Sequence, residues 1–552
     1  MKQESTQATS VNALNRAKMY QLVLFPMNNG ATNVYYILTM NFIAYYANGV
    51  LGLLLAFATT MVTLMRAGDA FIDPIIGAIM DRTSTKWGKF RPFMVIGNLI
   101  MIVSSILLYF GTRIISEDTI IIRFPITING NLIMIVSSIL LYFGTRIISE
   151  DMMWLRYLCF ILFYALNMVG YTFQTSVTRS GQTCLTNDPK QRPLFTIFNT
   201  IASLIGMGLV QFLAPIVTGG NYRTEEFFNI MIPLAMIVSA IMTALAVIGI
   251  AEKDRPEFFG LGGEGGKEKV KIKEYVAILK ANKELQRLMI AGAGCKLAFS
   301  IATNMTVLAM LYGAMMGDYK GLYLPMMIVG YVFSVPFFLL TVRTSQKKGQ
   351  KASLMLYISV ALVMYIGVLA LLLLWKPEVA AMNLSLTNLN LYTILFILFF
   401  GIGYGAYYAT ADMPIPMVAD CSDYETFRSG RYIPGIIGTL FSLVDKLVSS
   451  LGSTVVGIAV TIIGLSTLPD GTTPYSEGMH TIVIILFCVV PMLAWIATLI
   501  AMRGYKLTGA RMKEIQAINA VRKDAISKGM SVENAMQKWQ TIDQVPDEFK
   551  AH

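Results

Sequence analysis

Long apolar segments, separated by short polar ones, follow one another along almost the whole chain. A helix needs about 20 predominantly apolar residues to cross the hydrocarbon core of a bilayer. Thirteen apolar segments are candidate spans: residues 20–46, 50–80, 92–112, 131–145, 152–176, 194–218, 228–250, 288–313, 321–342, 352–374, 390–418, 433–465 and 480–502. The pattern predicts an all-α integral membrane protein.

Composition agrees with this prediction. The chain has 552 residues, of which 55% are hydrophobic and 14% charged, whereas soluble domains carry about 25% charged residues. Five scattered cysteines and two histidines predict neither a disulfide framework nor a histidine-based metal or catalytic site. The polar first fifteen residues predict no cleaved signal peptide. The net charge of +11 is typical of basic cytoplasmic loops, so we expect no nucleic-acid partner.

The distribution of lysine and arginine predicts the orientation in the membrane. Basic residues gather at 82–91, 251–288 and 343–351. The turns near 47–52, 219–227, 314–320, 375–389 and 466–479 together hold only Arg223, Lys320 and Lys376. Because basic loops stay in the cytoplasm, both termini are expected there, in a multi-pass protein of the cell membrane. The predicted layout is a cytoplasmic tail (1–19), a first half (20–250), a cytoplasmic linker (251–287), a second half (288–502) and a cytoplasmic tail (503–552).

One segment is duplicated. Residues 97–118 recur identically at 130–151, a period of 33 residues. A thirteenth full span would place the basic loops that follow outside the cell, against the charge bias. We therefore expect twelve membrane-spanning helices in two six-helix halves, with the first copy as the third span and the extra residues near 119–151 as an insertion that does not span.

The stretch from Arg66 to Arg82 carries the first candidate chemistry. Asp69 and Asp73 are four residues apart, so they share one face of a helix, and Arg66 lies one turn before Asp69. A carboxylate at membrane depth costs roughly 2.5–3.5 kcal/mol. Such a pair is expected to face a cavity, a partner charge or an ion.

Two sequence blocks resemble one transporter family. The first is Asp69-Ala-Phe-Ile-Asp73-Pro74 with Gly77, Asp81 and the Trp87–Pro92 run; the second is Met417–Glu425, followed by Arg428, Arg431 and Lys446. Together they resemble the glycoside–pentoside–hexuronide:cation symporters, the melibiose- and glucuronide-carrier branch of the major facilitator superfamily. The resemblance implies the twelve-helix fold of that superfamily, with a central cavity that opens alternately to each side, and no enzymatic activity.

The resemblance also implies roles for individual residues. We expect Asp69, Asp73, Thr172 and Thr175 to bind the coupling cation. We expect the substrate to meet Asn29, Thr32, Asn33, Tyr36, Thr175, Arg179 and Lys446, of which Lys446 is also placed to pair with the two carboxylates. Conformation-dependent ion pairs at the gates are expected from Arg66, Asp81, Arg82, Lys89, Arg91, Asp420, Asp423, Glu425 and Arg431. For the short loop from Asp81 to Pro92, a simple positive-inside anchor is the alternative, and for the polar residues of the first span it is helix packing.

The chain departs from the family pattern at the cation and sugar positions. Ile72 stands where sodium-using melibiose carriers have an asparagine, and it offers no oxygen ligand. Since Na⁺ requires several oxygens, H⁺ is favoured as the coupling ion and Na⁺ is the alternative. The acidic sugar ligands of the family are replaced by the Thr32–Asn33 region and by Thr175. Arg179 nearby suits an anionic hexuronide, or is a snorkelling anchor.

Further polar residues lie inside predicted spans. Asp412 precedes Pro414 in a segment where a broken helix would place an acid against a cavity. Asp445 and Lys446 form a local pair or point to different helix faces. Lys296 is expected to extend its ammonium group to the interface. Tyr404, Tyr407 and Tyr408 stack on a sugar or belong to the packing, and packing is favoured.

The function expected from these observations is cation-coupled symport of a sugar or glycoside (a pentoside, hexoside or hexuronide) by alternating access. No cofactor is expected besides the coupling ion, H⁺ or Na⁺. The alternative is the same fold carrying a lysolipid or another amphiphile. A membrane receptor or enzyme is disfavoured, because no nucleophile or metal spacing occurs and no large soluble domain is present. Residues 512–540 predict one basic amphipathic helix after the last span.

Overall fold

The computed structural model describes residues 16–83, 85–109, 153–186, 191–255, 272–379, 382–387, 389–430, 434–476 and 478–547. In these residues the chain is helical, apart from turns and one β-bridge between Thr85 and Gly88. Ten helices are long and apolar enough to cross a membrane, or eleven if the bent pair Lys283–Ala302 and Met305–Met315 is one span. The expected all-α membrane architecture is confirmed. The duplicated insertion near 119–151 lies outside the described residues.

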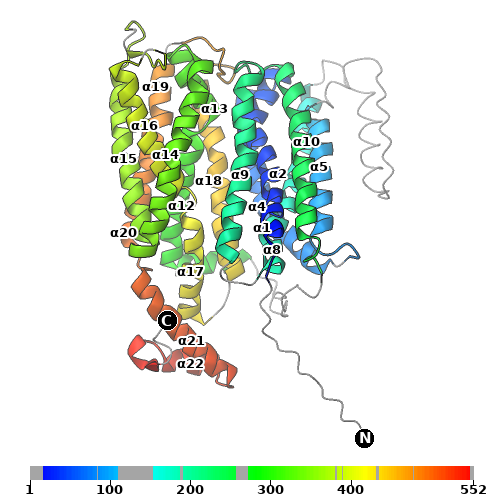
Figure 1. Cartoon of the computed structure of the whole chain (residues 1–552), viewed down its shortest axis with the longest axis vertical. Helices are drawn as coiled ribbons and strands as arrows, with labels where there is room; N and C mark the ends of the chain where they lie inside the picture. The colour runs from blue at the N-terminus through cyan, green and yellow to red at the C-terminus, as the bar shows by residue number, and fades with distance from the viewer. Residues whose placement is uncertain are drawn as a thin grey trace. The chain divides into compact units, whose positions relative to one another are not determined.

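The chain divides into two compact units, and Figure 1 labels most of the helices that belong to them. Unit 1 comprises residues within 1–42, 71–214 and 224–267. Its helices are α1 (Met19–Leu24), α2 (Met27–Ile37), the π-helix η1 (Leu38–Phe42), the second part of α4 (Leu55–Arg82), α5 (Arg91–Tyr109), α8 (Met153–Leu185), most of α9 (Gln191–Val217) and α10 (Glu225–Ile250).

Unit 2 comprises residues within 43–70, 215–223 and 268–552. Before the tail it contains α3 (Ile43–Tyr45), η2 (Tyr46–Val50), the first part of α4, α11 (Ile272–Ala281), α12 (Lys283–Ala302), α13 (Met305–Leu308), η5 (Ala309–Met315), α14 (Tyr319–Lys348), α15 (Gln350–Leu374), α16 (Leu391–Thr410), α17 (Pro414–Ser429), α18 (Pro434–Ile462), α19 (Met479–Val483), η7 (Ile484–Val489) and α20 (Val490–Gly504). Two segments of the predicted first half, residues 43–70 and 215–223, therefore pack with the second half. The predicted layout of two six-helix halves stays a prediction.

In unit 1, α5 and α8 pack closely because two glycines face each other. A Cβ atom built on Gly97 would lie 2.9 Å from the carbonyl oxygen of Gly170, and one on Gly170 would lie 2.8 Å from that of Gly97. Small residues let membrane helices approach to this distance, so the backbones themselves form the contact.

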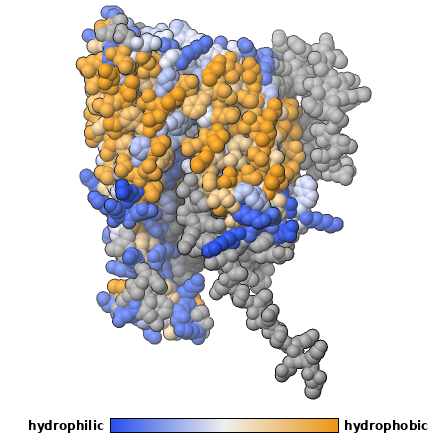
Figure 2. All heavy atoms as spheres, viewed as in Figure 1, coloured by the Kyte–Doolittle hydropathy of each residue, from blue (hydrophilic) through white to orange (hydrophobic). Residues whose placement is uncertain are grey.

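Unit 2 presents an apolar outer surface of the kind that faces lipid. Figure 2 shows hydrophobic residues covering the helices on the visible face. On α14 and α15, Leu339, Val332, Leu373 and Val363 are each more than half exposed. Since these helices are apolar on the outside as well, hydrocarbon rather than water is their natural surrounding.

Two of the predicted spans are broken, and a third contains two helices within one candidate span, Leu391–Ser429. The segment expected at 20–46 is interrupted at Phe25–Pro26 and contains two π-helical stretches. The segment expected at 288–313 bends by 44° between α12 and α13, where the side chain of Asn304 accepts a hydrogen bond from the Thr306 amide at 3.0 Å. The segment expected at 390–418 ends as α16 at Thr410, since Pro414 starts a new helix.

The second sequence block forms a helix. Residues 417–425 lie inside α17, which has Pro414 in its first turn and ends at Gly430 with a φ of +71°. Glycine adopts this left-handed conformation without the cost that a side chain would add, so it terminates the helix.

The tail is a helical hairpin, which corrects the single helix expected at 512–540. Helix α21 (Gly509–Ser527) turns at Gly529, whose φ is +96°, into α22 (Val532–Lys538) and the 3₁₀ turn η8 (Ile542–Gln544). These elements share a small core of buried residues: Ala517, Ile518, Val521, Ala535, Trp539 and Val545. In Figure 1, α21 and α22 lie beside the end of α17.

Candidate functional site

A buried charge cluster in unit 2 is centred on Asp69. The Oδ2 atom of Asp69 lies 2.8 Å from Nζ of Lys446 and 3.1 Å from Nη1 of Arg66. The Asp69 side chain is completely buried, and those of Lys446 and Arg66 are 4% and 11% exposed. The expected pairing of Lys446 with Asp69 is therefore observed, whereas Arg66, expected at a gate, belongs to the same cluster.

The cluster contains more positive than negative charge. Burying an unpaired carboxylate costs several kcal/mol, and here two cations compensate one anion. The three charges sum to +1, so any event that neutralises Asp69 leaves two buried cations without their shared partner. This makes the protonation state of one carboxyl group decisive for the contacts of two helices.

Hydroxyl contacts between α4 and α18 set the register that brings Asp69 to Lys446. Thr63 Oγ1 lies 2.7 Å from Thr454 Oγ1 and donates to the Ser450 carbonyl at 2.9 Å. One turn earlier, Thr59 lies against Gly457, where a Cβ atom would come within 2.3 Å of the threonine oxygen. The two helices touch through small and hydroxyl side chains, and the charged pair continues the same seam.

The other residues expected at the cation site belong to unit 1. Asp73 lies one turn after Asp69 on α4 and is half-buried. On α8, Thr172 donates to the carbonyl of Met168 at 3.0 Å, and Thr175 donates to that of Tyr171 at 3.1 Å. Their role in cation binding stays a prediction.

The residues expected at the sugar site form a polar face on α2 in unit 1. Asn33 donates to the carbonyl and side-chain oxygens of Asn29, at 2.7 and 3.1 Å. Thr32 donates to the same carbonyl at 2.8 Å, and the rings of Tyr36 and Tyr171 are stacked 6.5 Å apart. Most of these hydrogen bonds are made within α2 itself, so the face is locally organised. Arg179 lies on α8, but its side chain is outside the described residues.

The loop before α5 is held by a residue that sequence reasoning missed. The carboxylate of Asp254 accepts backbone N–H groups of Lys89 at 2.8 Å, Phe90 at 3.0 and 3.1 Å, and Arg91 at 2.9 Å. The Nε of Arg91 adds an ion pair at 3.3 Å. Asp254 is fully buried and thus caps the N-terminal turn of α5, where free N–H groups and the helix dipole favour an anion.

Gly88 makes room for this cap. Its φ is +105°, and a Cβ atom there would lie 2.3 Å from Oδ2 of Asp254. Lys89 and Arg91, which were expected at a gate, both bind the Asp254 carboxylate through their backbone N–H groups, and Arg91 also binds it through its side chain. The side chains of Asp81 and Arg82, at the end of α4, and the whole of Arg431 lie outside the described residues.

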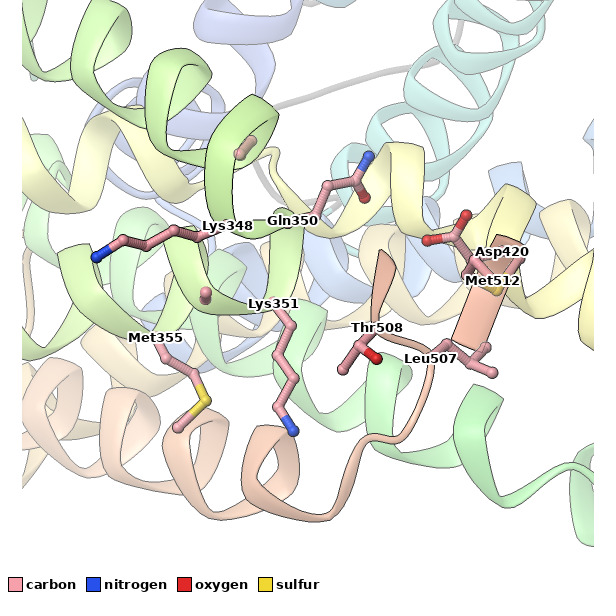
Figure 3. A pocket seen from close by; sticks show the side chains of 11 residues that line it. Lys348, Gln350, Lys351, Met355, Asp420, Leu507, Thr508 and Met512 are labelled. Atoms are coloured by element: carbon pink, nitrogen blue, oxygen red, sulfur yellow. The ribbon is translucent and has the colours of Figure 1, made fainter. Parts of the chain in front are cut away.

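The expected gate residues of α17 face three different partners. Glu425 is buried and binds Arg428 at 2.7 Å and the Asn282 amide at 3.0 Å. The carbonyl of Asp423 accepts a hydrogen bond from Asn519 of the tail at 2.9 Å. Asp420 lines a cavity of about 380 Å³. Figure 3 shows Asp420 across this cavity from Gln350 and Lys351, with Thr508 of the tail between them.

Sequence reasoning also missed a second ion pair in unit 2, between Arg223, just before α10, and Asp470, in the segment between α18 and α19. Arg223 forms two hydrogen bonds with the fully buried carboxylate of Asp470, at 2.9 and 3.4 Å. Beside it, the Gly471 amide donates to the Gly220 carbonyl at 2.8 Å, and the hydroxyl groups of Tyr222 and Tyr319 are 2.7 Å apart. Arg223 was visible in the sequence as a lone basic residue in turns expected outside. Its partner was not identifiable.

Sequence comparison decides the family. Residues 25–129 and 130–509 match the MFS/sugar transport protein family. The chain belongs to this family. The two matched segments meet at residue 130, where the second copy of the duplicated segment begins.

Named relatives of this sugar transport family agree with the blocks found in the sequence. The putative glycoside/cation symporter YagG of Escherichia coli (strain K12) is 23% identical over 86% of this chain and 89% of its own length. A lactose permease of Lactobacillus helveticus is 21% identical over 90% of this chain and 70% of its own length. Another, from Leuconostoc lactis, matches over 52% of this chain and 42% of its own length, at 24% identity. The resemblance to glycoside–pentoside–hexuronide:cation symporters is thereby confirmed.

Solved structures support the fold expected of the MFS/sugar transport protein family. A D-xylose-proton symporter superposes with a TM-score of 0.55 at 14% identity, over 87% of this chain and 97% of that chain. The nucleoside transporter NupG gives 0.53 at 13% identity, over 89% and 100%. At these identities the likeness concerns the fold, and the chemistry rests on the residues of this chain.

Proposed function

We propose that this protein is a secondary transporter of the cell membrane that couples the entry of a sugar or glycoside to the entry of H⁺. The supporting observation is the buried Asp69 carboxylate, shared by Lys446 and Arg66 within a membrane-spanning segment. Ionisable residues at such depth belong to substrate, ion or proton pathways. The family and its sugar-carrying relatives supply the substrate class.

A proton suits this site better than Na⁺. Lys446 and Arg66 both contact the same oxygen of Asp69, so a sodium ion would have to displace two cations and gather several oxygens around itself. Ile72 lies in the turn between Asp69 and Asp73, and its side chain has no oxygen atom that could bind Na⁺. A proton needs no coordination shell and neutralises the carboxyl group directly.

The coupling follows from the charge balance. Protonation of Asp69 removes the negative charge that the ammonium group of Lys446 contacts, so the ion pair between α4 and α18 is lost. Substrate binding stabilises the arrangement in which the seam is rearranged. Each ligand then favours the other, which is the thermodynamic requirement for symport.

We also propose that both termini lie in the cytoplasm and that the Arg223–Asp470 pair lies at the extracellular end. The basic 82–91 and 343–351 segments support this orientation. A thiol-specific, membrane-impermeant reagent tests it. Glu378→Cys should react in intact cells, and Ser531→Cys only after permeabilisation; both positions are exposed. The reverse pattern would contradict the orientation.

Proton movement tests the function. De-energised cells that express the protein are suspended in a weak buffer, and pentosides, hexosides and glucuronides are added one at a time while external pH is recorded. We expect one sugar class to cause alkalinisation, with or without sodium, because entering sugar carries H⁺ inward.

The matched variants are Asp69→Asn and Asp543→Asn, the second at an exposed carboxylate of the tail. Asp69→Asn should abolish alkalinisation at normal expression, and Asp543→Asn should leave it unchanged. Sugar entry that needs sodium would refute proton coupling, and absence of entry for every sugar would refute the substrate class.

A further inference from the structure

A second charge cluster lies in unit 2, apart from Asp69 and its two cations. The ammonium group of Lys296 on α12 lies 2.8 Å from Oδ1 of Asp412 and 3.8 Å from Oδ1 of Asp445. Asp412 is in the break between α16 and α17, and Asp445 is on α18 next to Lys446. Three elements thus meet at Lys296. The expectation that Lys296 extends its ammonium group to the interface stays a prediction, and within unit 2 this group is paired with two carboxylates.

The Asp412 carboxylate is accessible, unlike that of Asp69. The Asp412 side chain is 70% exposed and that of Asp445 is 32% exposed, whereas that of Lys296 is 18% exposed. All three residues lie in segments that qualify as membrane spans. A charge in such a segment is expected to face a water-filled cavity rather than hydrocarbon, because exposure to lipid would cost roughly 2.5–3.5 kcal/mol.

Asp412 lies in a short turn that joins α16 to α17 within the candidate span Leu391–Ser429. Pro414 and Pro416 cannot donate the hydrogen bonds that would continue α16, and the chain crosses the break through short turns, such as Met413 N–H to Thr410 oxygen at 3.2 Å. Discontinuous membrane helices present polar groups to substrates in many secondary transporters.

Aromatic rings flank the same cluster. Phe299 is one turn from Lys296 on α12, Tyr408 is one turn before Asp412 on α16, and their rings are 5.4 Å apart. Tyr331 on α14 lies 5.6 Å from Tyr408, edge to face. Tyr404 and Tyr407 are fully buried packing residues, as expected, but Phe299, Tyr331 and Tyr408 are only half-buried.

We propose that Lys296, Asp412 and Asp445 form a sugar subsite that selects neutral glycosides over hexuronides. Carboxylate oxygens accept hydrogen bonds from sugar hydroxyl groups, the ammonium group donates one, and a half-buried ring covers the apolar face of a pyranose. The cluster has one cation and two anions, so its formal charge is −1, and a hexuronide carboxylate would be repelled by Asp412. This preference is opposite to the one that Arg179 suggested in the sequence.

This inference rests on the proposed function, because it assigns part of the same substrate path. The acidic sugar ligands that the family has in the first and fourth spans are absent from this chain. In this proposal the accessible Asp412 carboxylate, on the second half of the chain, takes their place.

Sugar counterflow tests the subsite, since exchange of labelled for unlabelled sugar needs no net proton movement. In proteoliposomes, the sugar carried best by the wild-type protein is exchanged in the presence of phenyl β-D-glucoside or phenyl β-D-glucuronide, which differ in charge only at carbon six. We expect the glucoside to inhibit at least about tenfold better. We expect Asp412→Asn to raise the KM for the exchanged sugar about tenfold and to narrow that preference, which corresponds to the loss of one interaction of about 1.4 kcal/mol.

The control is Asp318→Asn, which removes an acid at the N-cap of α14 in the same unit. If Asp412→Asn does not reach the membrane, Asp445→Asn keeps the 2.8 Å pair intact and should raise the KM in the same direction. A wild-type KM and an unchanged preference in the variant would overturn the subsite and leave the proposed function standing. Absence of any sugar exchange by the wild-type protein would overturn the proposed function itself.

Discussion

Asp445 and Lys446 are neighbours on α18, yet their side chains join different charge clusters: Asp445 faces Lys296 at 3.8 Å, and Lys446 holds Asp69 at 2.8 Å. Successive residues of a helix point about 100° apart, so one turn of α18 serves two sites. A proton on Asp69 and a sugar at Asp412 would therefore act on the same piece of backbone.

The Asp69–Lys446 pair should be required for proton coupling, although its net contribution to the free energy of unfolding is small when both charges are removed together. Lys446→Met removes the ammonium group that lies 2.8 Å from the buried Asp69 carboxylate, and we expect the free energy of unfolding in detergent to fall by up to about 3–5 kcal/mol. The double variant Asp69→Asn/Lys446→Met should regain part of this loss, because both charges of the Asp69–Lys446 pair are then removed together and only the contact between Arg66 and residue 69 is weakened, while proton-coupled uptake stays absent. Lys523→Met, at an exposed lysine of the tail, is the control. A double variant as unstable as the single one would argue against the pairing.

The Arg223–Asp470 pair should keep one end of unit 2 closed. Arg223→Ala leaves the buried Asp470 carboxylate without its guanidinium, and opening of this end exposes the hydrogen-bonded pair Tyr45 and Thr306. In a Thr306→Cys background we expect labelling by an impermeant thiol reagent to become at least about tenfold faster, as a shift of about 1.4 kcal/mol toward the open form requires. Arg223→Lys, which keeps the charge, should give an intermediate rate. Equal rates in all three proteins would exclude a closing role.

A side chain at Gly88 should destabilise the protein through two effects, backbone strain and a clash with Asp254. Gly317 allows the backbone strain to be measured without the clash. Gly88→Ala adds left-handed strain of roughly 1–2 kcal/mol and also drives a methyl group into Asp254. Gly317→Ala carries the same type of strain at a φ of +74°, but nothing lies within 4 Å of its Cβ position. We expect the melting temperature to fall clearly further for Gly88→Ala. Similar losses in the two variants would mean that the contact with Asp254 is unimportant.

Arg522 should tie the tail to α17. Its guanidinium is buried, donates to the Trp539 carbonyl at 2.9 Å and to the Phe427 carbonyl at 2.7 Å, and lies 5.1 Å from the centre of the Phe427 ring. Burial lowers the pKa of Arg522, but the guanidinium stays charged at any physiological pH. Arg522→Ala should make trypsin cleavage within α21 several-fold faster, whereas Lys523→Ala, at the next and exposed residue, should remove a cleavage site and slow it. Unchanged cleavage in Arg522→Ala would show that the tail is held by other contacts.

The sequence predicted those parts of the site that lie close together or belong to a family pattern. The spacing of Asp69 and Asp73, the helical layout and the nearness of Lys446 were accessible in this way. Asp254 was not, because its partners are bonded 163 residues earlier in the chain and an acid after an apolar span resembles any interfacial residue. The partners of Lys296 were not accessible for a related reason: hydropathy reports the depth of a charge in the membrane, but it does not identify the residues of the neighbouring helix that pair with this charge.

The docking of α21 on α17 has a practical meaning for genetics of this protein. A deletion that begins before α21 removes the tail residues that pack on Phe427 and the Asn519 side chain that donates to the Asp423 carbonyl. Such a deletion therefore damages α17, which is part of the candidate span Leu391–Ser429. Loss of transport after such a deletion would therefore reflect structural damage to the transport domain, and it would give no information on regulation. Only point substitutions that leave Arg522 in place can ask whether the tail also responds to the cell.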